Sequence, residues 1–436
     1  MSKSKLFLLA SLIFLLSNFI YLLYFENKGN HSFGYGSFYT FRALVKNTDK
    51  KLDGYNIIIE PQNLVNFSGN ILLSAHLYPE YYYGDVLEVS CKVYKPEPIV
   101  EDGGTSFAYD KYLAKDDIFG TCFQPRIKVL GQNKDLSFYI LQAKKYVWQN
   151  LNDYLVEPSS SLSKAMFLAT RREIPSDLRD IFAKVGLSHM IAISGLHMAI
   201  IVWLMQSFLI TLGLSRKTSL WFLIFFLSAY LYIIGFPSSA VRASLMAIIL
   251  LLGPFLGRST ESIYSLVLVA DIFILFNPYL LLYDIGFQLS FLAVLGLLYY
   301  AKFFNRVLVF IPTKFKIREV MSVTLSAQIF TWPLIVYNFG IFSIIAPLAN
   351  FLILPLLPSV LILSIVLGMV GIWEGLANIV AWPLFIILKI IVYISDWLAK
   401  IPYSFIYLNN FSLNYMLVAL FFMIIITIIL KPKEYE

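Results

Sequence analysis

The chain begins with an apolar run, continues through one polar stretch, and then alternates between apolar runs and short polar loops. The first run, residues 6–25, follows Lys3 and Lys5 and is long enough to cross a hydrocarbon core of about 30 Å as a helix. It lacks a small-residue cleavage site, so we expect a retained anchor rather than a removed signal peptide. The preceding lysines predict a cytoplasmic N-terminus and an extracytoplasmic location for the polar stretch.

The polar stretch, residues 27–134, has the pattern of a small β domain. Short β-type runs alternate with turn residues, as in YNIIIEP and GDVLEVSCKVYKP, and this spacing predicts an antiparallel barrel or sandwich. Residues 105–118 predict a short helix between the last two runs. Because Cys91 and Cys122 lie in a region that we place outside the cytoplasm, we predict a disulfide between them, with two free buried thiols as the alternative.

A helical pattern connects this domain to the remaining chain. Residues 136–155 have apolar side chains at helical spacing, with Lys144 and Lys145 on the other side. The segment is too polar to cross a membrane, so we expect an interfacial helix. The chain is therefore divided into an anchor (1–26), an extracytoplasmic β domain (27–134), an interfacial helix and linker (135–160), and a multi-span domain (161–436).

Nine further apolar runs make up the multi-span domain: 187–213, 218–236, 239–256, 262–277, 279–301, 320–338, 358–374, 376–399 and 411–430. With the anchor they predict ten crossings, and the basic segments at 215–217, 302–318 and 431–433 then all lie in the cytoplasm. This count requires that residues 342–358 do not cross fully. Because Pro347, Asn350 and Pro355 interrupt that segment, we expect it to be re-entrant or broken, which requires surrounding protein or a water-filled cavity.

Composition supports a polytopic membrane protein. The 436 residues are 58% hydrophobic and only 14% charged, whereas roughly a quarter of the residues in a soluble chain are charged. The net charge of +7 suits a polyanionic partner, but it equally suits ordinary cytoplasmic loops, so charge alone does not identify a partner. The aromatic content of 17% is typical of lipid-facing and interfacial positions as much as of a stacking surface.

Several polar residues lie within the apolar runs, where a charge costs roughly 2.5–3.5 kcal/mol on insertion scales and therefore tends to face an interior or a pore. Arg242 is one, unless its side chain extends to the outer interface. Asp271 lies deeper, and we expect it to be paired, with Arg242 as one candidate partner. Asp284 shares a helical face with Gln288, although it fits a helix N-cap equally well. Further amide groups within these runs belong to Gln328 and Asn350.

The segment GLSHMIAISGLHM places His189 and His197 eight positions apart, which is close to two helical turns, with Ser194 and Gly195 between them at a position suited to a break. We interpret these residues as a polar strip that lines a passage. A zinc site is the alternative, but the chain has four histidines and no metal-binding spacing, so we expect no metal and no cofactor. A Ser–His hydrolase lacks the Gly-x-Ser-x-Gly turn, so we expect no catalytic residues and no enzyme activity.

Four motifs in order, GLSHMIAISGLHM, GFPSSAVRASLM, DIGFQLSFLAVLGLL and AQIFTWPLIVYNFGIFSIIAPLANFLILPLLP, resemble the competence domain of the ComEC family. The polar stretch is similar to that family's extracytoplasmic OB-like domain, including its pair of cysteines. The resemblance implies a polytopic α-helical protein of the inner membrane, with about ten spans, a re-entrant or broken helix, and a small all-β, OB-like domain. It implies a channel for single-stranded DNA during natural competence. Many members carry a C-terminal metallo-β-lactamase-like domain, and we expect this chain to be a short form without it.

The resemblance also implies partners and a DNA pathway. Besides the lipid bilayer and single-stranded DNA, we expect a periplasmic DNA-binding receptor and a cytoplasmic motor or DNA-binding proteins, and a homo-oligomer remains open. Basic residues of the β domain, with Tyr94, Phe107 and Tyr109 nearby, are candidates for DNA contact: Lys92, Lys95, Lys111, Lys115, Arg126 and Lys128. The DNA-pathway candidates are His189, Ser194, Gly195, His197, Arg242, Asp271, Asp284, Gln288, Gln328 and Asn350. The alternative function is a secondary transporter for a small anionic solute.

Overall fold

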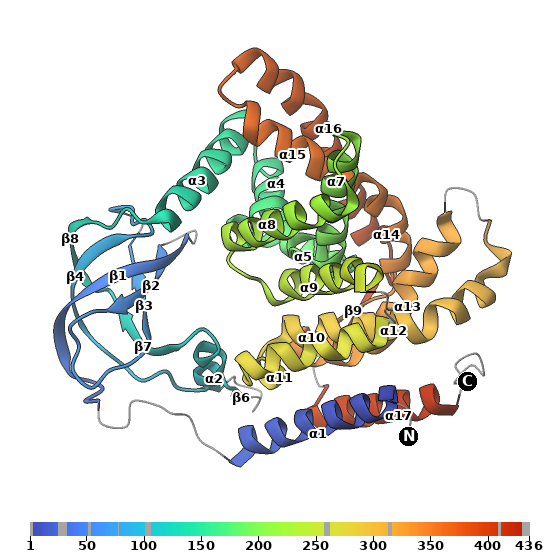
Figure 1. Ribbon diagram of the computed structural model, residues 1–436, viewed down its shortest axis with the longest axis horizontal. Helices are drawn as coiled ribbons and strands as arrows, with labels where there is room; N and C mark the ends of the chain where they lie inside the picture. Colours follow the sequence, from blue (N-terminus) through green and yellow to red (C-terminus); the bar gives the residue numbers. More distant parts are fainter. Residues whose placement is uncertain are drawn as a thin grey trace. The chain divides into compact units, whose positions relative to one another are not determined.

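The computed structural model describes residues 3–24, 33–50, 54–76, 78–100, 106–256, 262–312, 316–408 and 411–429. The chain divides into two compact units. The first comprises Met1–Tyr146 and Val267–Ile285, and it contains the β sheet (Figure 1). The second comprises Val147–Leu266 and Gly286–Glu436, and it is mainly helical.

Six strands of the first unit form one curved sheet (Figure 1). They are β1 (Phe38–Lys50), β2 (Tyr55–Pro61), β3 (Asn70–Ala75), β4 (Asp85–Lys92), β7 (Ile118–Phe123) and β8 (Arg126–Gln132), in the order β7-β3-β2-β1-β4-β8. Four neighbouring pairs are antiparallel, as predicted, but β3 and β7 are parallel. The prediction is wrong for that pair because the connection from β4 to β7 is a long crossover that contains a helix, and such a connection can return a strand in either direction.

Two local features differ from the sequence pattern. The last predicted run forms two strands, because Gln124 has a left-handed φ of 48° and Pro125 has no N–H for a ladder. The predicted helix at 105–118 is shorter. Ser106–Phe107 forms strand β6, which pairs with β5 (Ile99–Val100), and the helix α2 comprises only Tyr109–Ala114. The buried side chain of Leu113 packs with Leu72 and Ile118 and holds α2 against the sheet.

The two ends of the strand order β7-β3-β2-β1-β4 meet. The Tyr94 N–H donates to the Thr121 carbonyl at 2.8 Å, and the Thr121 N–H donates to the Tyr94 carbonyl at 2.9 Å, so the chain after β4 pairs with β7. A disulfide joins Cys91 of β4 to Cys122 of β7, with 6.3 Å between their Cα atoms, which confirms the predicted pairing. The sheet therefore encloses its own apolar core.

Two apolar clusters contain most of the described buried apolar residues of the helical second unit. In one, Leu162, Phe182, Leu361 and Leu388 are buried among α4 (Ser159–Leu168), α5 (Ser176–Lys184), α15 (Leu357–Val370) and α16 (Glu374–Ala399). In the other, Met198, Leu223, Leu227 and Ala240 are buried among α7 (Gly195–Thr211), α8 (Arg216–Ile234) and α9 (Ser238–Leu252). Most of these residues lie on the apolar runs that the sequence pattern identified.

Five helical segments among the described residues are long and apolar enough to cross a membrane: Arg216–Ile234, Ile285–Phe310, Ile317–Phe339, Ala346–Val370 and Glu374–Ala399. Shorter apolar helices are Ala10–Tyr21, Gly195–Thr211, Ser238–Leu252, Ser262–Phe276 and Leu413–Thr427. The helix α3 (Leu136–Tyr154) coincides with the segment for which an interfacial helix was predicted.

The interrupted segment at 342–358 is broken, which is one of the two forms predicted for it. It begins in β9 (Ile341–Ser343), which pairs with β10 (Phe405–Tyr407), and continues through α14 (Ala346–Ile353), a 3₁₀ turn η5 (Leu354–Leu356) and α15. The helix is thus broken, but it forms one run with the next predicted span rather than a separate re-entrant element. The prolines permit this because they lie in the first turns of their helices, where a missing N–H breaks no intrahelical hydrogen bond.

Candidate functional site

The break at Ser194–Gly195 is present in the second unit. Three residues separate the end of the short helix α6 (Ser188–Ile191) from the start of α7 at Gly195. Ser194 has an extended backbone and caps α7, because its Oγ accepts from the His197 N–H while the His197 side chain accepts from the Ser194 N–H. The sequence therefore predicted the position of the break, and the polar residues at the break are used to cap the helix.

His197 is completely buried, and its two ring nitrogens have different surroundings. Nδ1 lies 3.3 Å from the Ser194 N and 2.9 Å from the Ser194 Oγ. Because the Ser194 N–H can only donate, Nδ1 is an acceptor, and a neutral ring then carries its proton on Nε2. Nε2 is buried and has no hydrogen-bond partner among the described residues. His197 thus presents an unsatisfied donor.

His189 does not share a face with His197. The helix is interrupted between them, so the helical spacing on which that prediction rested does not hold across the break. The His189 side chain is exposed, and its Nδ1 lies 3.2 Å from the Gly186 carbonyl. The common-face prediction is therefore wrong, although both residues belong to the region around the break.

Arg242 of α9 is buried, with 7% of its surface exposed. Its Nε donates to the Ser290 Oγ of α12 (Ile285–Val307), its Nη1 lies 3.5 Å from the Met246 sulfur, and its Cζ lies 5.8 Å from the centre of the Phe291 ring. All three partners are neutral. The guanidinium also lies against Gly195, where an added Cβ would be 2.9 Å from Nη2. Arg242 is therefore placed at the helix break.

Asp271 and Asp284 belong to the first unit and have partners there. The Ser11 Oγ of α1 (Lys3–Tyr24) donates to the Asp271 carboxylate at 2.5 Å. Asp284 precedes the first residue of α12, and its carboxylate accepts from the Lys115 Nζ at 3.2 Å. The sequence could not identify either partner, because both lie more than 150 positions away along the chain.

The two amide candidates connect helices of the second unit. Gln328 of α13 (Ile317–Phe339) donates to the Ser343 carbonyl at 2.7 Å, and Asn350 of α14 donates to the Thr324 Oγ1 at 3.3 Å. Both residues therefore hold α13 against the interrupted segment. Gln288 lies, partly buried, in the first turn of α12.

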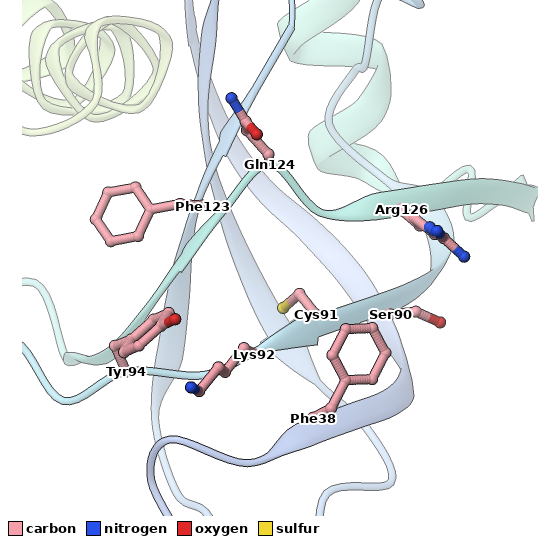
Figure 2. A pocket seen from close by; sticks show the side chains of 8 residues that line it. All are labelled: Phe38, Ser90, Cys91, Lys92, Tyr94, Phe123, Gln124 and Arg126. Carbon is pink, nitrogen blue, oxygen red and sulfur yellow. The ribbon is translucent and has the colours of Figure 1, made fainter.

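A pocket of about 420 Å³ lies on the sheet of the first unit (Figure 2). Its lining combines aromatic rings with two cations: Phe38, Ser90, Cys91, Lys92, Tyr94, Phe123, Gln124 and Arg126. Phe38 and Phe123 are 66% and 64% exposed, an unusual position for phenylalanine. The Tyr94 and Phe123 ring centres are 6.2 Å apart, and the Lys92 Nζ lies 5.3 Å from the Tyr94 ring. The pocket thus offers apolar faces beside positive charge.

The sequence identified only part of this surface. Lys92, Tyr94 and Arg126 were predicted, whereas Phe38 and Phe123 were missed because β1 and β7 come together only through the curvature of the sheet. Two of the proposed basic residues have other contacts: Lys111 lies 5.4 Å from the Tyr283 ring, and Lys115 pairs with Asp284. The predicted basic set therefore does not form one patch.

A polytopic helical protein with a small disulfide-linked β domain is the class that these features define. Residues 166–433 match the protein family described as Competence protein, so the chain belongs to that family, the ComEC family that its motifs resemble. The chain is 28% identical over 250 residues to "ComE operon protein 3" of Bacillus subtilis (strain 168). That alignment covers 57% of this chain but only 31% of the relative, so the chain spans about a third of that curated protein. No solved structure matches.

Proposed function

We propose that this protein is the membrane channel through which one strand of transforming DNA enters the cytoplasm. Its membership of the competence family supports a role in DNA uptake. The observation that carries the channel is the buried Arg242 at a helix break, in a unit made of apolar helices. A buried guanidinium with neutral partners is costly in a solid helical bundle, but it suits a pathway for phosphate groups.

Ten crossings follow if the five shorter apolar helices also span. The 17-residue helix Gly195–Thr211 is about 25 Å long at 1.5 Å per residue, and its capping residues add to that length. With ten crossings of the inner membrane, both termini lie in the cytoplasm. The β domain then lies on the extracytoplasmic side. A periplasmic DNA-binding receptor would deliver DNA to the β domain, and a cytoplasmic motor or DNA-binding proteins would pull the strand.

The β domain contributes an outer contact for the strand. The parallel β3–β7 pair and the return of β7 to the chain after β4 support an OB-like barrel. Such barrels bind single strands by stacking bases on aromatic rings, at roughly 1–3 kcal/mol per base, beside a basic groove. Tyr94 and Phe123, with Lys92 and Arg126, supply both kinds of group. Passage of a strand through a channel breaks no covalent bond, so this function calls for no catalytic residue.

A deletion strain complemented with the full chain tests the channel. We expect labelled DNA to reach the periplasm but not the cytoplasm in the deletion strain, and entry to return on complementation. Normal cytoplasmic entry without the protein would overturn the proposal. Uptake of a small anion that depends on an ion gradient, and that is the same in competent and non-competent cells, would instead support the secondary transporter.

A further inference from the structure

We propose that the first turn of α7 and the guanidinium of Arg242 form a single anion-binding station for a phosphodiester group. The identity of the occupant rests on the proposed function, because the strand supplies the phosphodiester. The station itself rests on the geometry around Gly195, which brings two positive groups together, with no carboxylate paired to them among the residues that the structure describes.

The first positive group is the N-terminus of α7. This helix has 17 residues, and the aligned peptides of a helix place roughly half a positive charge at its N-terminus. Ser194 caps one N–H of the first turn, the one that belongs to His197. The N–H groups of Gly195 and Leu196 precede any possible acceptor within the helix, so they are available to an oxyanion.

The second positive group is Arg242, whose Nη2 lies beside Gly195. A guanidinium stays protonated at physiological pH and cannot remove its own charge. Within the described part of its unit, its partners are a hydroxyl, a thioether and an aromatic ring, and no carboxylate forms an ion pair with it. A cation placed against the positive end of a helix is repelled, and a bound anion reverses that energy for both groups.

Gly195 has a spatial reason to lack a side chain. It does not have a positive φ, so its backbone conformation does not require glycine. A Cβ at this position would lie 2.9 Å from Nη2 and 4.0 Å from Cζ of Arg242, so any larger residue would push the guanidinium away from the helix. The glycine therefore permits the approach of Arg242 to the α7 backbone.

The surroundings fix this arrangement and leave a further donor. The Ser239 Oγ of α9 donates to the Ile193 carbonyl at 2.7 Å, which ties the break to the helix that carries Arg242. The His197 Nε2, buried in the same turn, has no partner among the described residues. One guanidinium with a few neutral donors binds a phosphate weakly enough to release it, as a translocation pathway requires.

Salt dependence of binding tests the station in the purified full chain. The probe is a labelled thymidine oligonucleotide, and its Kd is measured at several salt concentrations. Each phosphate contact to a single strand contributes about 0.7 to the salt slope. Arg242→Gln should lower the slope of log Kd against log salt concentration by that amount. When the salt concentration is reduced fourfold, the factor by which binding strengthens should then be about 2.6 times smaller in the variant than in the unmodified protein. Arg216→Gln, at an exposed arginine, is the matched control and should leave the slope unchanged.

Gly195→Ala provides a second variant that keeps the arginine. It should reduce the slope as Arg242→Gln does, whereas Gly375→Ala, where a Cβ meets no atom within 4 Å, should not. An unchanged slope in both Arg242→Gln and Gly195→Ala, together with no effect of inorganic phosphate on the Tm of the unmodified protein, overturns the station even if DNA uptake still requires the protein. If inorganic phosphate raises the Tm of the unmodified protein but not of Arg242→Gln, and the slopes are unchanged, the station binds small anions and the DNA assignment is wrong.

Discussion

The Lys115 Nζ lies 3.2 Å from the Asp284 carboxylate, and both side chains are largely buried, at 14% and 12% exposure. The Asn277 side chain adds a second link, since its Nδ2 donates to the Lys115 carbonyl at 2.7 Å. The β domain is thus joined within the first unit to the turn that precedes α12. Removal of one partner leaves a buried charge without its counter-ion.

We expect Lys115→Met to destabilise the first unit by about 3 kcal/mol, because a buried carboxylate that loses its lysine counter-ion is strongly unfavourable. The double variant Lys115→Met/Asp284→Leu should recover part of that loss. Lys46→Met provides the control, since Lys46 and Glu60 form an exposed pair at 2.8 Å that is worth less than about 1 kcal/mol. Thermal unfolding of the full chain measures all three, and equal effects of Lys115→Met and Lys46→Met would contradict the prediction.

The same pair predicts a pH dependence. Burial alone lowers the pKa of Lys115, but the charges of Asp284, Tyr112 and Asp116 outweigh it and raise that pKa above its ordinary value. A raised lysine pKa contributes stability that is fully present below the unfolded-state value, near 10.5, and that is lost as the pH rises through the folded-state value. Between pH 9 and 12, the free energy of unfolding should fall less in Lys115→Met than in the unmodified protein.

The disulfide should stabilise the β domain. Cys91 and Cys122 are 31 positions apart, and the chain-entropy relation gives about 3–4 kcal/mol for a loop of that length. We expect the double variant Cys91→Ser/Cys122→Ser to unfold at a lower temperature than the oxidised protein, and reductant to have no further effect on it. Alkylation and mass measurement of the native purified protein check the bond. Two alkylated cysteines before reduction would show that it is absent.

The pocket on the sheet of the first unit predicts where a single strand of DNA stacks. Phe123→Ala and Tyr94→Ala should each weaken binding of a single-stranded oligonucleotide about 5- to 150-fold, because one stacked base is worth roughly 1–3 kcal/mol. Tyr78→Ala is the control, since Tyr78 is 81% exposed and lies outside the pocket lining. Fluorescence anisotropy with the full chain measures each Kd. A loss in Tyr78→Ala as large as in Phe123→Ala would mean that the pocket is not the contact.

Local patterns predicted local structure, whereas partners distant in sequence had to come from the structure. The Ser194–Gly195 break, the N-terminal helix and most strands follow from spacing and turn residues, which act over a few positions. The parallel β7 and the pairing of Asp284 with Lys115 depend on how distant segments meet. Lys164 shows the limit clearly: it follows a serine-rich stretch, yet its Nζ is buried 2.8 Å from the Glu173 carboxylate and 4.4 Å from the centre of the Trp148 ring. No spacing rule connects those three residues.

Substitutions of Ser194 distinguish a structural role of this residue from a catalytic one. Its hydroxyl caps α7, and loss of such a cap typically costs about 1 kcal/mol. We therefore expect Ser194→Ala to lower DNA uptake only in proportion to the amount of protein in the membrane, while Ser194→Asp, which keeps a capping oxygen but adds a negative charge beside Arg242, should lower uptake per molecule. Uptake normalised to membrane level distinguishes the two. A complete loss of uptake in Ser194→Ala at normal protein level would favour a nucleophilic serine over a helix cap.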